Sequence, residues 1–152
     1  MATVDTAMYA VHLLAGGVWA GSVVFVTWAV LPTAADGTAN AVPLAAITGK
    51  LRNLSRLAAL LSLATGGHMA ANFYDVDSLT GSTGGRLVLG MVVLWFALIA
   101  LVEVGGGKLA SGFADKKVRE PAREARPYLL AASVAAVLVL LDAGLLASGF
   151  IA

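Results

Sequence analysis

The sequence predicts an all-α integral membrane protein, a four-helix transmembrane bundle with up-down topology and both termini outside the cell. Three observations predict this fold: the chain is strongly apolar, its apolar residues fall in four long stretches, and its basic residues gather on one side of those stretches. Hydrophobic residues make up 59% of the 152 residues and charged residues only 12%. A soluble domain carries about 25% charged residues, so we expect much of this surface to face lipid.

Four stretches have the length and composition of membrane spans, which need roughly 20 apolar residues at 1.5 Å rise per residue. They cover residues 8–31, 54–73, 87–104 and 128–151. The chain is therefore predicted to be one transmembrane domain, 1–152, with a charged cytoplasmic connector at 105–127. The segment before the first stretch has no Lys or Arg, and the stretch is too long for a signal peptide. We expect it to remain as a membrane helix.

The distribution of basic residues predicts the orientation. Of the ten Lys and Arg residues, only Arg86 would lie on the side of the second loop. The other nine flank the start of the second stretch or lie in and beside the connector. Positively charged loops stay in the cytoplasm, so the loop at 74–86 and both termini are expected outside. The expected location is the cell membrane, with several crossings.

Composition also excludes several classes of function. The chain has no cysteine, which excludes disulfides, zinc fingers, thiolate metal sites and iron–sulfur ligation. A net charge of +1 gives no reason to expect a nucleic-acid partner. No nucleophile–base set, phosphate loop or pair of carboxylates at one depth is visible, so we do not expect an enzyme.

Two histidines lie inside the predicted spans, where ionisable residues are costly and indicate function. His12 follows Asp5 by seven residues, and His68 precedes Asp75 by seven residues. If these aspartates mark the outer ends of the two helices, each histidine lies roughly 10 Å below the outer surface. Consecutive antiparallel helices are usually neighbours. The two histidines are therefore predicted to form a pair of axial or metal ligands.

Small and polar residues beside the histidines favour a large ligand. Gly16 and Trp19 share the face of the first histidine at helical spacing, and Gly67 and Asn72 lie next to the second. Glycine beside a ligand leaves room for a flat macrocycle, and bis-His ligation in a four-helix bundle is typical of b-type haem. The leading hypothesis is a haem b protein for electron transfer or haem handling.

Copper is the alternative occupant of the same histidines. Imidazole is a copper ligand, and Met8 or Met69 would add a thioether, which Cu(I) prefers. Without any ligand, each histidine would join helices by hydrogen bonds and the glycines would allow close packing.

Three further ionisable residues in or near the predicted spans have candidate roles. Asp142, in the last stretch, would fix the tautomer of a ligand histidine or carry protons; otherwise it is a structural carboxyl. Arg86 would pair with haem propionates or with aspartates of the outer loop, or anchor the helix at the interface. Glu103 is expected to pair with a base near the inner edge: Arg52, Arg56 or Lys108.

Three segments resemble the membrane domain of the copper-resistance CopD family: HLLAGGVWAGSVVFVTWAVLP, RNLSRLAALLSLATGG and GRLVLGMVVLWFALIAL. His12, Trp19 and Gly21 stand where the family's opening helix has such residues. Arg56 matches the basic residue that enters the next helix, and Gly85-Arg86-Leu87 matches the turn into the third. The resemblance runs from His12 to about Leu101 and implies membrane copper handling. Family members commonly have more spans, and methionine is sparse here.

The bilayer is the expected partner. A redox or copper-carrier protein on the outer side is a further candidate, and so is a second copy of the chain packed on Gly17 and Gly21. A third hypothesis of a different class is a cofactor-free accessory or scaffold subunit of a membrane complex.

Overall fold

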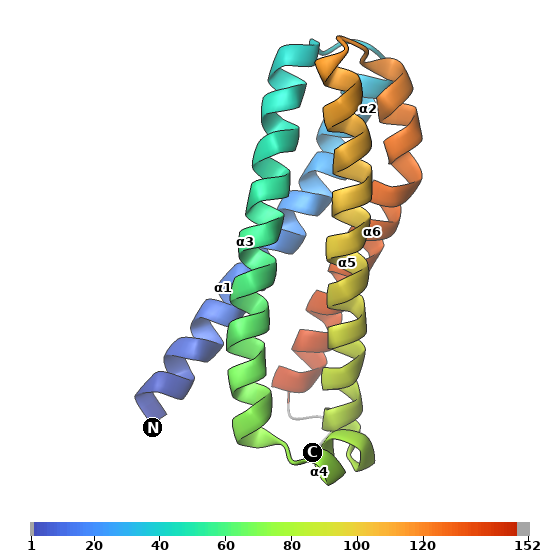
Figure 1. The fold of residues 1–152 in the computed structure, drawn as a ribbon. Helices are drawn as coiled ribbons and strands as arrows, with labels where there is room; N and C mark the ends of the chain where they lie inside the picture. The colour runs from blue at the N-terminus through green and yellow to red at the C-terminus, as the bar shows by residue number, and fades with distance from the viewer. Residues whose placement is uncertain (1, 149–152) are drawn as a thin grey trace.

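The computed structural model describes residues 2–148, which form helices and no strand (Figure 1). The elements are α1 (Ala2–Phe25), η1 (Val26–Val30), α2 (Leu31–Ala35), α3 (Ala41–Phe73), α4 (Val76–Gly81), α5 (Thr83–Ala114) and α6 (Arg119–Ala147). The first three elements follow one another without a break and make one long helical rod. The all-α prediction is confirmed for the described residues.

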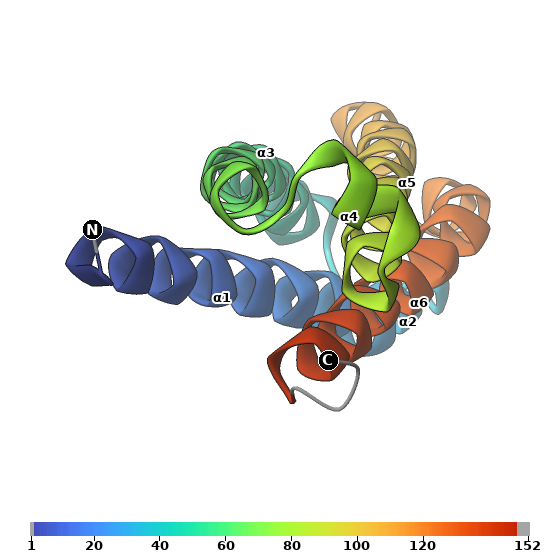
Figure 2. The ribbon, with the colours of Figure 1, turned by 90° about the horizontal axis from the view of Figure 1, so that it is seen from below.

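The long helices lie side by side and alternate in direction (Figure 1). α3 packs against α1 and α5, and α6 packs against α5 and α1. The start of α1, the end of α6 and α4 lie at one end of the molecule, which we call the terminal end (Figure 1). The α5–α6 turn and α2 lie at the other, which we call the connector end. Figure 2 shows that α1 crosses the others obliquely, so its N-terminal half diverges from α5 and α6.

Three helical segments are long and apolar enough to cross a bilayer: Thr3–Ala35, Thr83–Ala114 and Arg119–Ala147. The second predicted span lies within α3, which is not among them. Arg56, His68 and Asn72 fall inside that predicted span and reduce its apolar character. The last predicted span extends to residue 151, and its final three residues lie outside the described part of the chain.

Most of the predicted charged connector at 105–127 is helical. α5 continues to Ala114 and α6 starts at Arg119, so only residues 115–118 turn, with Lys116 at a φ of 59°. The glycine run that suggests a loop in the sequence is a place of close helix contact. A Cβ at Gly105 would lie 3.0 Å from Leu129 Cγ, and one at Gly106 would lie 2.8 Å from Arg52 Cγ.

The first span also continues beyond its predicted end at Leu31. Pro32 lacks an N–H group and its ring crowds the preceding turn of an α-helix. Here the backbone widens into the π-helical turn η1 just before Pro32, and helix continues to Ala35. A π-turn is a recognised cause of local irregularity in helices. The proline therefore changes the helix type without ending the helix.

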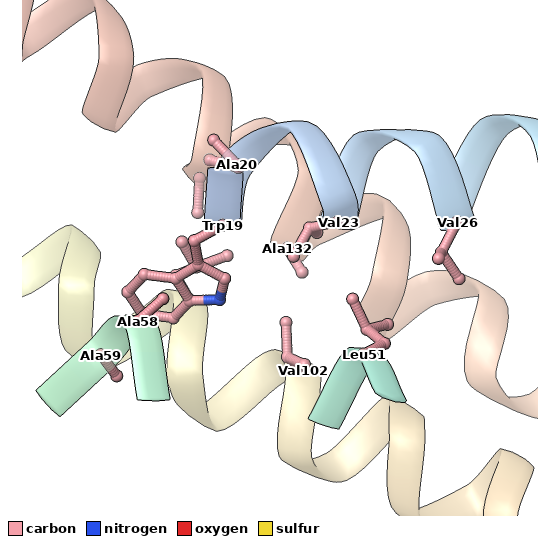
Figure 3. Close-up of a cluster of buried hydrophobic side chains, with 12 residues drawn as sticks. Trp19, Ala20, Val23, Val26, Leu51, Ala58, Ala59, Val102 and Ala132 are labelled. Carbon is pink, nitrogen blue, oxygen red and sulfur yellow. The ribbon is translucent and has the colours of Figure 1, made fainter. Parts of the chain in front are cut away.

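The centre of the molecule is packed with small side chains around one tryptophan (Figure 3). Trp19 and Val23 of α1, Ala58 of α3, Val102 of α5 and Ala132 of α6 are all buried. Alanines allow helices to approach closely, and the indole fills the remaining space. Trp19 Nε1 also donates a 2.7 Å hydrogen bond to Ser55 Oγ, which joins α1 to α3.

An ion cluster joins α3 to α5 toward the connector end. Glu103 accepts hydrogen bonds from Arg52 Nη2 at 2.8 Å and from Arg56 Nε and Nη2 at 2.7 and 2.8 Å. The predicted pairing of Glu103 with Arg52 or Arg56 is confirmed. Lys108 instead lies 3.6 Å from Glu124 of α6.

Candidate cofactor site

A cavity of about 360 Å³ lies toward the terminal end, with walls from α1, α3, α5 and α6. Along α3 it extends from Ser62 to Phe73, about 16 Å of helix. Its walls are mainly apolar and aromatic, including Leu13, Val88, Met91, Trp95 and Leu146. Sites for small molecules and cofactors are typically clefts of roughly 300–1,000 Å³ with such walls and a few polar groups.

His12 is the imidazole that lines this cavity, and its tautomer follows from its partner. His12 Nδ1 lies 2.9 Å from Thr65 Oγ1. The Thr65 hydroxyl donates its one hydrogen to the Leu61 carbonyl at 2.6 Å, so it accepts from His12. Nδ1 therefore carries the ring proton, and Nε2 keeps its lone pair. No described residue makes a hydrogen bond to Nε2, which is the state of a histidine ready to bind a metal.

Gly66 gives the His12 ring its place. A Cβ at Gly66 would lie 2.8 Å from His12 Cε1, a separation that real Cβ atoms essentially never show, and 3.3 Å from Nδ1, which is tight. The neighbouring Gly67 also lines the cavity, but a Cβ there would meet nothing within 4 Å. The two adjacent glycines therefore have different roles. Gly66 admits the histidine, and Gly67 leaves open space.

Ser62 is the first residue of α3 that lines the cavity, on the side toward the connector end, and its hydroxyl has no hydrogen-bond partner within residues 2–148. The residue is 7% exposed, and its Oγ has no hydrogen-bond partner among the described residues. A buried hydroxyl without a partner costs roughly 1–3 kcal/mol. This cost would be relieved by a polar atom of a bound molecule. Ser62 and His12 both have bonding capacity to spare, and the hydroxyl-bearing Tyr9 and Tyr74 also line the cavity.

His68 lies in a different setting. Its Nε2 is 3.2 Å from Asp5 Oδ1 of α1 and 3.2 Å from Asn72 Nδ2. Asn72 also donates to the His68 backbone carbonyl at 2.8 Å. His68 does not line the cavity that holds His12. A two-histidine site would require His68 to leave Asp5, so the paired arrangement stays a prediction.

The other residues predicted for the site are dispersed. Trp19 is part of the central core, and Gly16 lies on α1 where a Cβ would meet nothing within 4 Å. Arg86 donates from Nε and Nη2 to the carbonyls of Thr80 and Gly81, at 3.3 and 3.2 Å, and so satisfies the end of α4. Its described contacts are with these carbonyls and not with Asp75 or Asp77. Asp142 is buried between helices near Gly90 of α5 and makes no contact with either histidine among the hydrogen bonds described.

Two thioethers share the cavity with His12. Met69 of α3 and Met91 of α5 both line it, whereas Met8, which the copper hypothesis also considered, does not. Within residues 2–148, no group of three His, Cys, Asp or Glu side chains comes together as a metal site. Any metal in the cavity would therefore rely on one imidazole and on sulfur.

Sequence reasoning missed Ser62, Thr65 and Met91. Ser62 and Thr65 are the two hydroxyl residues of an otherwise apolar stretch, spaced so that both face α1, and this spacing was the available signal. Met91 has no such signal, because methionine in an apolar helix looks like any core residue.

No known protein family, curated protein or solved structure matches this chain.

Proposed function

We propose that the chain is a multi-pass membrane protein that holds b-type haem in the cavity, with His12 as an iron ligand. The carrying observation is the 2.9 Å contact between His12 Nδ1 and Thr65 Oγ1, whose hydroxyl donates to Leu61. This contact assigns the ring proton to Nδ1 and the lone pair to Nε2. Neutral imidazole in this state is the usual protein ligand of haem iron. The apolar walls and the size of the cavity suit a large flat cofactor better than a single ion.

The chain's own residues would hold and shield the cofactor. His12 would bind the iron, Trp95 and Phe73 would cover its faces or edges with apolar surface, and Met69 and Met91 would be available as thioether donors. Haem bound there would supply a one-electron centre near one surface of the membrane. The Ser62 hydroxyl would form a hydrogen bond with a polar group of the cofactor.

The proposal includes four membrane crossings with both termini outside. The basic residues support it, since the connector end carries the bases of the α5–α6 hairpin and of the first half of α3. The terminal end carries Arg86 alone. This asymmetry would place the connector end in the cytoplasm and the cavity near the outer surface.

The orientation can be tested with single cysteines, because the chain has none of its own. We expect Asp77→Cys to react with a membrane-impermeant maleimide in intact cells. We expect Lys116→Cys to react only after the cells are lysed. The reverse pattern would place the cavity on the cytoplasmic side.

The haem is tested by the absorption spectrum of detergent-purified protein, oxidised and then reduced with dithionite. We expect a sharp Soret band and reduced α and β bands, lost in His12→Ala. His68→Ala is the matched comparison, and we expect it to retain the Soret band because His68 does not line the cavity. Loss of the band in both variants would restore the two-histidine arrangement. A colourless wild-type protein from haem-replete cells would reject haem.

Copper is the second candidate, favoured by Met69 and Met91 in the same cavity as His12. One imidazole with thioethers is a soft donor set that suits Cu(I). Copper predicts stoichiometric metal without a Soret band, lost in His12→Ala and reduced by replacing either methionine with leucine. An accessory or scaffold subunit predicts neither signal, together with stable co-purification of a partner.

A further inference from the structure

Asp142 of α6 is a carboxyl group buried between helices that has no ionic partner among the described residues. It is 8% exposed, and its Oδ1 is buried and makes no hydrogen bond. On α5 it lies near Gly90, where a Cβ would be 3.9 Å from Oδ2. The absence of a side chain at Gly90 leaves space for the carboxyl but provides no donor. An ionised carboxylate in such a place would be very costly.

The charged groups on the helices that pack against α6 are engaged elsewhere. On α5, Arg86 bonds to carbonyls of α4, Glu103 bonds to two arginines, and Lys108 pairs with Glu124. On α1, Asp5 bonds to His68. η1 and α2 carry no charged residue. His12 and Tyr9 are the remaining titratable groups of α1, and the ring proton of His12 is already used toward Thr65.

Asp142 lies in the same layer of the molecule as the His12 site. The Trp95 indole donates to the Ala59 carbonyl, which sets α5 against α3. From that bond, Gly90 is about 7.5 Å and Gly66 about 10.5 Å further toward the terminal end, at 1.5 Å per residue. Gly90 contacts Asp142 and Gly66 contacts His12, so the two groups are at nearly equal depth. Ala143 and Met91, the neighbours of Asp142 and Gly90 in sequence, line the cavity.

We propose that Asp142 is a proton-binding site, a carboxylic acid that exchanges its proton with the terminal-end solution through the cavity. The acid form is neutral, which fits its apolar surroundings. It releases one proton to water entering the cavity and takes one back. The route is the cavity while no haem fills it, so the exchange is measured on protein purified without haem.

Infrared spectroscopy of the protein in liposomes tests the proposal. We expect the carbonyl stretching band of a protonated carboxylic acid at neutral pH, absent in Asp142→Asn. Asparagine has the same shape and carries no charge, so we expect this variant to fold. Transfer to D₂O should shift the band. A wild-type spectrum without a band that Asp142→Asn removes would show an ionised Asp142, and a band that never shifts would show a trapped proton; either result overturns the proposal.

The route is tested separately by filling the cavity. Gly67 lines the cavity and has open space around it, so Gly67→Leu should narrow the passage. Gly49 lies on the same helix near the connector end, is exposed, and also has open space, so Gly49→Leu is the matched control. We expect deuterium exchange at the Asp142 band to slow at least tenfold in Gly67→Leu and to keep the wild-type rate in Gly49→Leu. Equal rates in the two variants, both purified without haem, would refute the cavity as the route.

Discussion

The ring of His12 lies directly against the backbone of Gly66, so closely that a methyl group at Gly66 would come within 2.8 Å of His12 Cε1. The ring can occupy this position between α1 and α3 because residue 66 has no side chain. The position of the proposed iron ligand therefore depends on a neighbour that contributes no chemistry of its own.

Replacing Gly66 with alanine should displace His12. The added methyl must push the ring away from Thr65 or separate α1 from α3, and overpacking of this kind costs about 1–3 kcal/mol. We expect a lower thermal unfolding midpoint in detergent. Gly67→Ala is the matched control, because its methyl enters open space and alanine favours helix by up to about 1 kcal/mol. If both variants melted alike, the contact between His12 and Gly66 would not be present in the protein.

Replacing Thr65 with valine should weaken cofactor binding without removing the ligand. Valine has the shape of threonine but cannot accept the Nδ1 proton of His12, so the ring loses its fixed tautomer and orientation. Loss of such a supporting bond typically costs 10–100-fold in metal affinity. Titration of haem into the apoprotein measures the change. Thr65→Ser keeps the hydroxyl, and we expect its affinity to stay close to that of the wild type.

The helical character of the chain was predictable from the sequence, and so was the pairing of Glu103. Long apolar stretches leave helix as the natural way to satisfy the backbone in lipid. Glu103 stands near several bases at the same end of the spans, so its partner had to be one of them. The partners are Arg52 and Arg56 and not Lys108, because α3 packs beside α5 at that level.

Helix ends and side-chain partners were less predictable. The third predicted span ends at residue 104, yet α5 continues through Gly105 and Gly106, where Leu129 and Arg52 approach closely. Pro32 suggests a helix end, yet the helix continues past it to Ala35 after the π-helical turn η1. In both cases packing against another helix overrides the local preference of the residue.

The placement of the two histidines shows a second limit. Equal depth was inferred from Asp5 and Asp75 as helix ends, but α1 starts before Asp5 and crosses α3 obliquely (Figure 2). Asp5 of α1 therefore contacts His68 of α3. His12 contacts α3 at Thr65, about one helical turn before His68 in the sequence. The crossing angle of two helices depends on the side chains along the whole contact. It cannot be predicted from the spacing of residues within one helix.

The start of α4 should become less stable in acid. The bonds to the Ser78 side chain and backbone hold the pKa of Asp75 below its ordinary value of 3.8. A carboxyl group with a lowered pKa stabilises the folded state above its unfolded pKa, and this contribution is lost as the pH falls through the folded pKa. We expect the Ser78 amide to lose protection from hydrogen exchange below about pH 4. Asp75→Asn should remove this pH dependence, whereas Asp77→Asn should leave it unchanged, because Ser78 bonds to Asp75.

Replacing Glu103 with glutamine should destabilise the contact between α3 and α5. The Arg52 and Glu103 side chains are 27% and 29% exposed, so neither is fully hydrated when its partner is lost. Hydrogen bonds to charged groups contribute roughly 1.5–3 kcal/mol, and partial exposure reduces this, so we expect a loss of about 1–2 kcal/mol on unfolding. Glu124→Gln removes the longer and more exposed pair with Lys108 and should cost less than about 0.5 kcal/mol.

A double-mutant cycle separates the pair itself from the cost of stranding one charge. If Arg52 and Glu103 stabilise the helix contact together, Arg52→Gln combined with Glu103→Gln should cost less than the sum of the two single variants. A difference of about 1 kcal/mol is expected for residues in direct contact. Additive losses would mean that the 2.8 Å bond between them contributes nothing, and that Arg56 alone holds Glu103 in place.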